Sequence, residues 1–174
     1  LSADQLLHFP DFRAGERAYQ LMVQVSGRAG RKKKQGKVVI QAFNTASPVL
    51  REVFEHDYFG FFQREMQERH GFRYPPYVRL IRVTLKHKKP QVLNDAGRIL
   101  AGALKHQLGD WVVGPAVPYV ARVRNYYLLD FLIKINQDKN KIKHAKDCIL
   151  NSIDRLHQTA GYSGVRVNVD VDPG

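Results

Sequence analysis

A short string of glycines and arginines is the part of this sequence with the most specific chemical capability. It reads Gln24-Val25-Ser26-Gly27-Arg28-Ala29-Gly30-Arg31. Glycine lets a backbone or a phosphate approach closely, and a planar guanidinium stays charged and can bind two phosphate oxygens at once. Two such groups three residues apart suit the γ-phosphate of a nucleotide, where an arginine finger is worth about 10³–10⁵ in rate. The alternative is a solvated basic helix end.

A second kind of candidate site mixes basic and aromatic side chains. Arg122 and Arg124 precede Tyr126 and Tyr127, and such a mixture can bind phosphates and stack on bases. Phosphate contacts position a nucleic acid without reading its sequence, so a DNA structure such as a fork is the expected target. The alternative for each basic run is ordinary solvated charge. The predicted DNA-binding residues are Lys32, Lys33, Lys34, Lys86, Lys88, Lys89, Arg122, Arg124, Tyr126 and Tyr127.

The overall charge agrees with a nucleic-acid partner. The chain has 174 residues, with 28 Lys plus Arg against 16 Asp plus Glu, and a formal net charge of +12. Residues 1–77 carry 12 basic and 8 acidic side chains, and residues 78–174 carry 16 and 8, so both parts are basic. Nucleic acid is the commonest acidic partner of such a surface, because neutralising phosphates releases counterions.

Other chemistries are disfavoured by what the sequence lacks. The single cysteine, Cys148, excludes an internal disulfide and a thiolate-rich zinc site, and it suits a reducing cytosol. The seven histidines do not fall at metal-ligand spacing, so no bound metal is expected. The serines lie in no nucleophile elbow, and no Gly-x-x-x-x-Gly-Lys-[Ser/Thr] loop is present. No run approaches the ~20 apolar residues of a membrane helix, so no membrane contact is expected.

The elements that must position these residues fall into two parts. In residues 1–73, apolar residues at helical spacing predict a helix over 16–29, with Gln24 and Arg28 on its polar face. Residues 37–41 predict a buried strand. Two further helices are predicted to begin at Pro48 and after Asp57.

The character of the sequence changes at Tyr74-Pro75-Pro76-Tyr77, where two prolines predict an extended joint. In residues 78–174, alternating apolar positions predict strands and positions at 3.6-residue spacing predict helices. Their order is strand, helix, strand, strand, helix, strand, which is the βαββαβ order of the ferredoxin-like α+β fold. This fold hosts catalysts, RNA binders and plain connectors, so it does not by itself give a function.

The string from Gln24 to Arg31 resembles motif VI of superfamily 2 helicases, which reads Gln-x-x-Gly-Arg-x-Gly-Arg. Further segments, in order, resemble the PriA family, the bacterial primosomal proteins N-prime, and the resemblance covers nearly the whole chain. One departure is Ser26, where the family more often has Ala. The matching segments include Pro10-Asp11-Phe12-Arg13-Ala14, Gly36-Lys37-Val38-Val39-Ile40-Gln41, Tyr74-Pro75-Pro76-Tyr77, Gly114-Pro115-Ala116, Ala121-Arg122-Val123-Arg124 and Val167-Asn168-Val169-Asp170-Val171-Asp172-Pro173.

The resemblance implies a fold and a set of site residues. Residues 1–73 would be the end of a RecA-like helicase lobe 2, and residues 78–174 would form a C-terminal domain for DNA binding and protein interaction. The fold class is then α/β, with the ferredoxin-like domain after the lobe. Motif VI implies catalytic roles for Gln24, Arg28 and Arg31, and ATP contacts for Gly27, Gly30, Arg28 and Arg31.

The resemblance also implies an activity. The longer protein would be a cytoplasmic, ATP-dependent 3′-to-5′ DNA helicase that recognises stalled or repaired replication forks and directs primosome assembly. It would bind ATP and Mg²⁺, hold zinc in a cysteine-rich module, and contact forked and single-stranded DNA, single-stranded DNA-binding protein and other primosome proteins. This chain lacks the phosphate loop, an Asp-Glu-x-His box and the zinc module. We therefore expect this chain to hydrolyse no ATP alone. A monomer is the default expectation for its oligomeric state.

Two other interpretations stay open. The chain could be a stand-alone, non-enzymatic nucleic-acid-binding module, which the ferredoxin-like half and the net charge would permit. It could also be a platform whose basic grooves bind acidic peptide tails, a role that is compatible with the helicase interpretation. The motif VI string favours the helicase over the plain binding module, because a binding module has no need of it.

Overall fold

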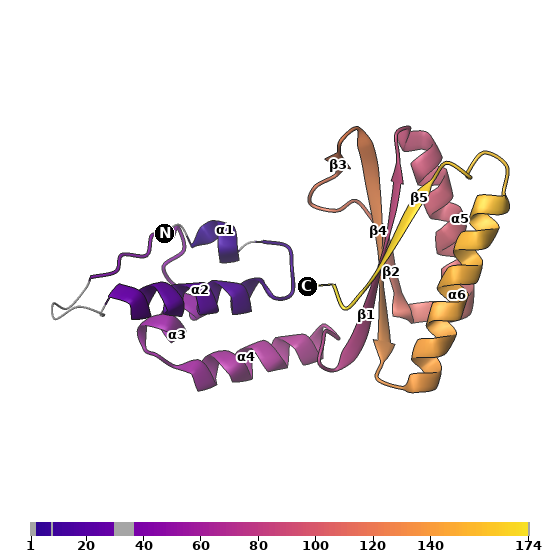
Figure 1. Cartoon of the computed structure of the whole chain (residues 1–174). Coiled ribbons are helices and arrows are strands. Elements are labelled where there is room, and N and C mark those ends of the chain that lie inside the picture. The colour runs from indigo at the N-terminus through magenta and orange to yellow at the C-terminus, as the bar shows by residue number, and fades with distance from the viewer. Residues whose placement is uncertain (1–2, 8, 30–36, 174) are drawn as a thin grey trace. The chain divides into compact units, whose positions relative to one another are not determined.

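The computed structural model describes residues 3–7, 9–29 and 37–173, and it divides the chain into two compact units. Unit 1 is residues 1–72 and unit 2 is residues 73–174 (Figure 1). Each unit has a hydrophobic core of its own. No helix in the described part of the chain is long and apolar enough to cross a membrane.

The described part of unit 1 is helical. It contains α1 (Asp4–Leu7), α2 (Ala14–Ala29), α3 (Pro48–Phe54) and α4 (Tyr58–Gly71). The predicted helix over 16–29 is confirmed as α2, which begins two residues earlier. Its apolar face packs on α3 and on Phe61 of α4, whose ring stacks on Tyr19 with centroids 4.2 Å apart. The buried core residues are Ala3, Ala18, Tyr19, Met22, Val49, Leu50, Val53 and Phe61.

The two predicted helix starts are also confirmed. Pro48 occupies the first turn of α3, where the missing N–H of proline costs no hydrogen bond. Asp57 caps α4, because its carboxylate accepts a hydrogen bond of 2.8 Å from the backbone N–H of Gly60.

The predicted strand over residues 37–41 is wrong. This segment forms no strand in the described structure, and the carbonyl of Gln41 accepts a bond of 2.9 Å from the backbone N–H of Ala3. Val39 is 69% exposed rather than buried. A strand needs a neighbour to pair with, and the described residues of unit 1 supply no other strand. The RecA-like character of residues 1–73 therefore stays a prediction.

The joint at residues 74–77 is a turn rather than an extended segment. The backbone N–H of Tyr77 donates a bond of 3.1 Å to the carbonyl of Tyr74. The two prolines fix φ but leave ψ free, so they permit a turn as readily as an extended chain. Beside the turn, the Lys134 ammonium lies 3.9 Å from the centre of the Tyr74 ring. Burial, and then the charge of Arg73, lowers the pKa of Lys134.

Unit 2 contains one antiparallel sheet. Its strand order is β2-β4-β1-β5, with the short β3 paired to β4. The predicted βαββαβ order is confirmed, and β3 is an addition that the sequence pattern does not reveal. The elements are β1 (Val78–His87), α5 (Pro90–Leu108), a short 3₁₀ helix (Gly109–Trp111), β2 (Val112–Ala116), β3 (Arg122–Val123), β4 (Tyr126–Asn136), α6 (Lys139–Gln158) and β5 (Arg166–Val171).

The two faces of this sheet differ. Helices α5 and α6 lie together on one face (Figure 1), and the side chains of Ile81, Val83 and Leu85 are buried in the core that they cover. Because side chains alternate along a strand, Arg82 and Lys86 belong to the other face. They are only partly buried, and no helix of unit 2 packs there. We call this second face the open face.

Candidate nucleic-acid interface

The clearest gathering of functional side chains surrounds Tyr126, at the start of β4. The guanidinium carbon of Arg166 lies 4.8 Å from the centre of the Tyr126 ring, and the ammonium of Lys88 lies 5.7 Å from it. Arg166 begins β5, and Lys88 follows the end of β1. Cations at these distances from an aromatic face are attracted by its electron density. Three segments far apart in the sequence thus meet at one end of the sheet.

The pairing of the strands explains why these side chains meet. Lys86 of β1 pairs with Leu128 of β4 on one side and with Arg166 of β5 on the other. Residues paired across strands share a face, so Lys86 and Arg166 both lie on the open face. Tyr126 precedes Leu128 by two positions and therefore projects to the same face.

A second contact of the same kind holds the neighbouring hairpin. The guanidinium carbon of Arg122 lies 5.0 Å from the centre of the Tyr127 ring. Its Nη2 also donates a bond of 2.9 Å to Oδ1 of Asn125. Arg124 and Asn125 form the turn between β3 and β4, with φ of 47° and 66°. Two positive φ values are the signature of a tight hairpin turn, whose twist matches that of the flanking strands.

Acidic residues confine the positive charge to this end of the sheet. Asp130, further along β4, accepts a bond of 2.7 Å from the Thr84 hydroxyl. Asp170 of β5 lies opposite Arg82 of β1 in the strand register. Anions are therefore attracted to the end of the sheet that carries Tyr126, and less to the middle of the open face. The residues at that end, which we call the basic–aromatic cluster, are Lys86, Lys88, Arg122, Tyr126, Tyr127 and Arg166.

The structure brings together most of the predicted DNA-binding residues. Lys86, Lys88, Arg122, Tyr126 and Tyr127 belong to the cluster, and Arg124 and Lys89 lie next to it on exposed turns. The predicted residues Lys32, Lys33 and Lys34 lie outside the part of the chain that is described.

Sequence reasoning missed Arg166. It treated this arginine as one of the polar positions that alternate along the last strand. Pairing the last strand with the first, as the ferredoxin-like order requires, would have placed Arg166 beside Lys86. The fold thus contained the signal, whereas the local sequence around Arg166 did not.

The predicted nucleotide-binding residues lie on α2. Gln24, Gly27 and Arg28 are exposed on this helix, and Arg28 makes no ion pair with another described residue. Gly30 and Arg31 lie outside the described residues. An exposed guanidinium on a helix end is free to reach a phosphate that another part of a longer protein supplies.

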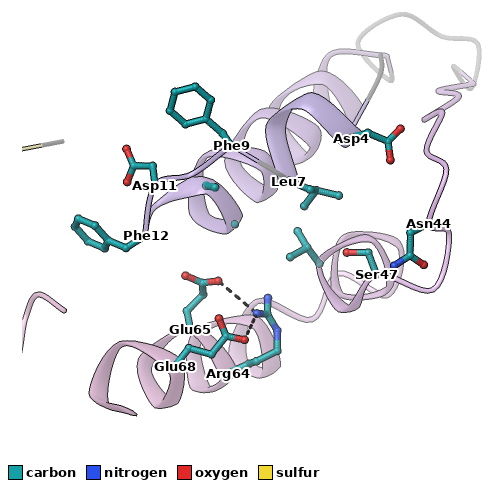
Figure 2. Close-up of a pocket in the computed structure, with 13 residues that line it drawn as sticks. Asp4, Leu7, Phe9, Asp11, Phe12, Asn44, Ser47, Arg64, Glu65 and Glu68 are labelled. Atoms are coloured by element: carbon teal, nitrogen blue, oxygen red, sulfur yellow. Dashed lines mark hydrogen bonds and ion pairs between the residues drawn. The ribbon is translucent and has the colours of Figure 1, made fainter. Parts of the chain in front are cut away.

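Unit 1 also contains a cavity of about 310 Å³ (Figure 2). Arg64 is the one basic side chain in its lining, and it is engaged by Glu65 at 3.4 Å and by Glu68 at 3.2 Å. Burial raises the pKa of Glu65 more than the two neighbouring arginines lower it. Carboxylates repel a triphosphate, so this cavity does not fit ATP. Its lining residues are Asp4, Leu7, Phe9, Asp11, Phe12, Ala14, Gly15, Asn44, Ser47, Val49, Arg64, Glu65 and Glu68.

The geometry defines unit 2 as a ferredoxin-like α+β domain whose open sheet face carries cations and Tyr126 at one end. Residues 70–174 match the family described as the primosomal protein N C-terminal domain. This match covers more than half of the chain, which therefore belongs to that family. The described residues contain no group of three His, Cys, Asp or Glu side chains that could hold a metal ion.

Known relatives match over almost the whole chain. A protein of Haemophilus influenzae named replication restart protein PriA is 39% identical over 179 residues, which is 99% of this chain and 23% of the relative. Proteins of the same name from Treponema pallidum and Bacillus subtilis are 36% and 34% identical, and cover 98% and 99% of this chain. This chain spans 25% and 21% of those two relatives.

Proposed function

We propose that this chain is the C-terminal part of an ATP-dependent 3′-to-5′ DNA helicase that acts in replication restart. Its family membership and the name of its relatives, replication restart protein PriA, support a role in replication restart. In this proposal unit 2 contacts DNA at a stalled or repaired fork, and unit 1 supplies part of an ATP site in the longer protein. Single-stranded DNA-binding protein and other primosome proteins are the proposed partners.

The observation that carries the DNA-binding role is the position of Tyr126 beside Arg166 and Lys88. Phosphates attract both cations, and binding them releases the counterions that surround DNA. An aromatic ring next to the phosphate path can stack on an unpaired base, which is worth roughly 1–3 kcal/mol per base. A site of this kind binds the backbone and exposed bases without reading sequence, as a protein that recognises DNA structure requires.

The proposed ATP role rests on α2. Gln24 and Arg28 lie on its exposed surface, where they could approach a nucleotide held by another lobe. When ATP and Mg²⁺ are bound, they supply the phosphoryl group and the charge neutralisation. In this proposal Arg28 and Arg31 stabilise negative charge on the γ-phosphate, and Gln24, Gly27 and Gly30 shape the approach to it. Zinc would belong to the cysteine-rich module of the longer protein, and this chain would bind none.

The test is a titration of this chain against fluorescent forked, single-stranded and duplex DNA of matched length. Four phosphate contacts would weaken duplex binding roughly 100-fold between about 50 and 200 mM salt. We expect a dependence of this size, and tighter binding to the fork than to the other two. Replacing Lys88 and Arg122 by alanine should reduce the salt slope by about 2.

The matched control replaces two exposed cations of α5, Arg98 and Lys105, which lie on the helix-covered side of the sheet. This control should lose less affinity than the Lys88 and Arg122 variant. If the unaltered chain binds DNA no better than an unrelated basic protein does, the DNA-binding proposal is wrong. That result would favour a platform for acidic peptide tails.

A further inference from the structure

The loop between β2 and β4 exposes an unusual number of apolar side chains. Val117 is 65% exposed, Tyr119 80%, Val120 55% and Val123 47%. Isolated apolar residues are common on protein surfaces, but a group within one short segment indicates an interaction site. We call residues 117–125 the apolar loop. It lies outside the basic–aromatic cluster, apart from Arg122.

The apolar loop is held in place rather than left free. Arg122 and Val123 pair with Tyr127 and Tyr126 of β4. The backbone N–H of Leu128 donates a bond of 3.0 Å to the carbonyl of Ala121. The segment with β3 projects from the side of the sheet opposite to α5 and α6 (Figure 1). A constrained hairpin can present its side chains to a partner at little cost in conformational entropy.

The charge around the loop indicates what the partner is. Arg122 and Arg124 lie within the loop, and Lys88 and Arg166 lie beside Tyr126, the first residue after its turn. No acidic residue occurs between Val117 and Leu129. The partner must therefore combine negative charge with apolar surface.

Duplex DNA satisfies only half of this requirement. Its outer surface is lined by phosphates, and its bases are stacked inside. Unpaired bases present flat apolar faces next to phosphates, and they occur where a duplex opens into single strands. Apolar side chains inserted at a disturbed base step are a known way to hold such a site.

We propose that the apolar loop seats against the first unpaired bases at a junction between duplex and single-stranded DNA. Tyr119, Val120 and Val123 pack on these bases, while Arg122 and Arg124 hold the flanking phosphates. This inference rests on the proposed function, because it requires that the chain binds DNA. It adds the position on the DNA at which this domain sits.

The experiment uses forked DNA with the fluorescent base 2-aminopurine either at the junction or well inside the duplex arm. Binding of the chain should change the fluorescence of the junction probe and leave the duplex probe unchanged. A variant with Tyr119→Ser and Val120→Ser should lose this change and bind the fork roughly fivefold or more weakly, the effect of losing one stacked base. Its affinity for plain duplex should change less. Leu150→Ser, at a 57% exposed apolar position on α6, is the matched control and should behave as the unaltered chain.

A second measurement does not depend on removing side chains. With the photoreactive residue p-benzoylphenylalanine in place of Tyr119, crosslinks should map to nucleotides at the junction. Crosslinks spread evenly along the duplex would overturn the inference while the DNA-binding proposal stands. The same holds if the fluorescence change of the junction 2-aminopurine survives in the Tyr119→Ser, Val120→Ser variant. A chain that binds none of the DNAs specifically would overturn both.

Discussion

The guanidinium of Arg166 lies 4.8 Å from the centre of the Tyr126 ring, although the two residues belong to different strands that are not neighbours in the sheet. Lys86 of β1 lies between their strands and pairs with Arg166 directly. A phosphate bound at this position would meet two cations and an aromatic ring that the sheet itself holds in place. Substitution of Arg166 therefore tests whether the open face binds DNA.

We expect Arg166→Ala to weaken DNA binding and to reduce the magnitude of the salt slope by about 1, because one phosphate contact is lost. Arg166→Lys should restore the slope but not the full affinity, since an ammonium is not a planar group that can stack on the ring. Fluorescence titrations of single-stranded DNA at several salt concentrations measure both quantities. Arg98→Ala is the control, because Arg98 is an exposed arginine on α5. Equal effects of Arg166→Ala and Arg98→Ala would remove Arg166 from the interface.

A separate prediction concerns the arginines of the glycine-rich string, in the longer helicase that we propose. Arg28→Ala or Arg31→Ala should lower ATP hydrolysis by about 10³-fold or more, because either change removes charge stabilisation at the γ-phosphate. DNA affinity should stay within about twofold, since the proposed DNA contacts lie in unit 2. Steady-state hydrolysis with saturating DNA measures the effect. Gln20→Ala, at another exposed position of α2, is the control. Normal hydrolysis in both arginine variants would show that the string is not motif VI.

The strands and helices of unit 2 could be predicted because each carries its own periodic pattern. Ile81, Val83 and Leu85 alternate with polar residues, and the structure buries them in the core beneath α5 and α6. The local sequence of a strand does not determine which other strands it pairs with, however. Arg166 was missed for that reason, and so was the short β3, whose formation depends on β4.

At residues 37–41 the sequence pattern predicted a strand that the structure does not form. Their apolar run has the composition of a buried strand, but hydrogen bonding to a neighbour decides whether a strand forms.

The cluster around Tyr126 was predicted in part, because Arg122, Arg124 and the tyrosines are close together in the sequence. The contact between Lys88 and Tyr126 depends on the pairing of β1 with β4, which a local sequence pattern does not predict.

The ionic network of unit 1 predicts a specific dependence on pH. Glu65 lies 3.4 Å from Arg64 and 3.6 Å from Arg69, yet burial raises its pKa above the ordinary value of 4.5. In the window between the ordinary and the raised pKa, the folded state binds more protons at Glu65 than the unfolded state does. The free energy of unfolding that Glu65 contributes is therefore fully present below the ordinary pKa, and it falls as the pH rises through this window.

Glu65→Gln removes this titration. In urea denaturation followed by far-UV circular dichroism, the two proteins should have similar midpoints at about pH 4. At about pH 7 the variant should have the higher midpoint, because the unaltered chain has lost the stability that Glu65 contributes. Glu68→Gln is the control, because Glu68 also pairs with Arg64 but its side chain is 57% exposed. Its midpoint should follow that of the unaltered chain. A Glu65→Gln variant that loses relative stability as the pH rises would show that the ion pairs outweigh the cost of burial.

The last prediction concerns the strand beside the apolar loop. Gly114 lies in β2, where the register with β4 shifts, and its φ is 112°. A Cβ at this position would lie 2.7 Å from the carbonyl oxygen of Asp130 and 3.3 Å from Cα of Phe131. Both neighbours are backbone atoms of β4, which cannot move aside without disturbing the sheet. The positive φ adds strain for any residue other than glycine.

Gly114→Ala should therefore lower the free energy of unfolding by about 2 kcal/mol or more, since strain at such a position alone costs about 1–3 kcal/mol. Urea denaturation followed by the fluorescence of Trp111, which immediately precedes β2, measures the change. Gly102→Ala is the matched control on α5, where a new Cβ meets no atom within 4 Å. It should stabilise unit 2 by roughly 0.5–1 kcal/mol, because alanine favours a helix over glycine by that amount. Equal midpoints for the two variants would mean that β2 adjusts to a side chain at position 114. The close contact between β2 and β4 would then not constrain the start of the apolar loop.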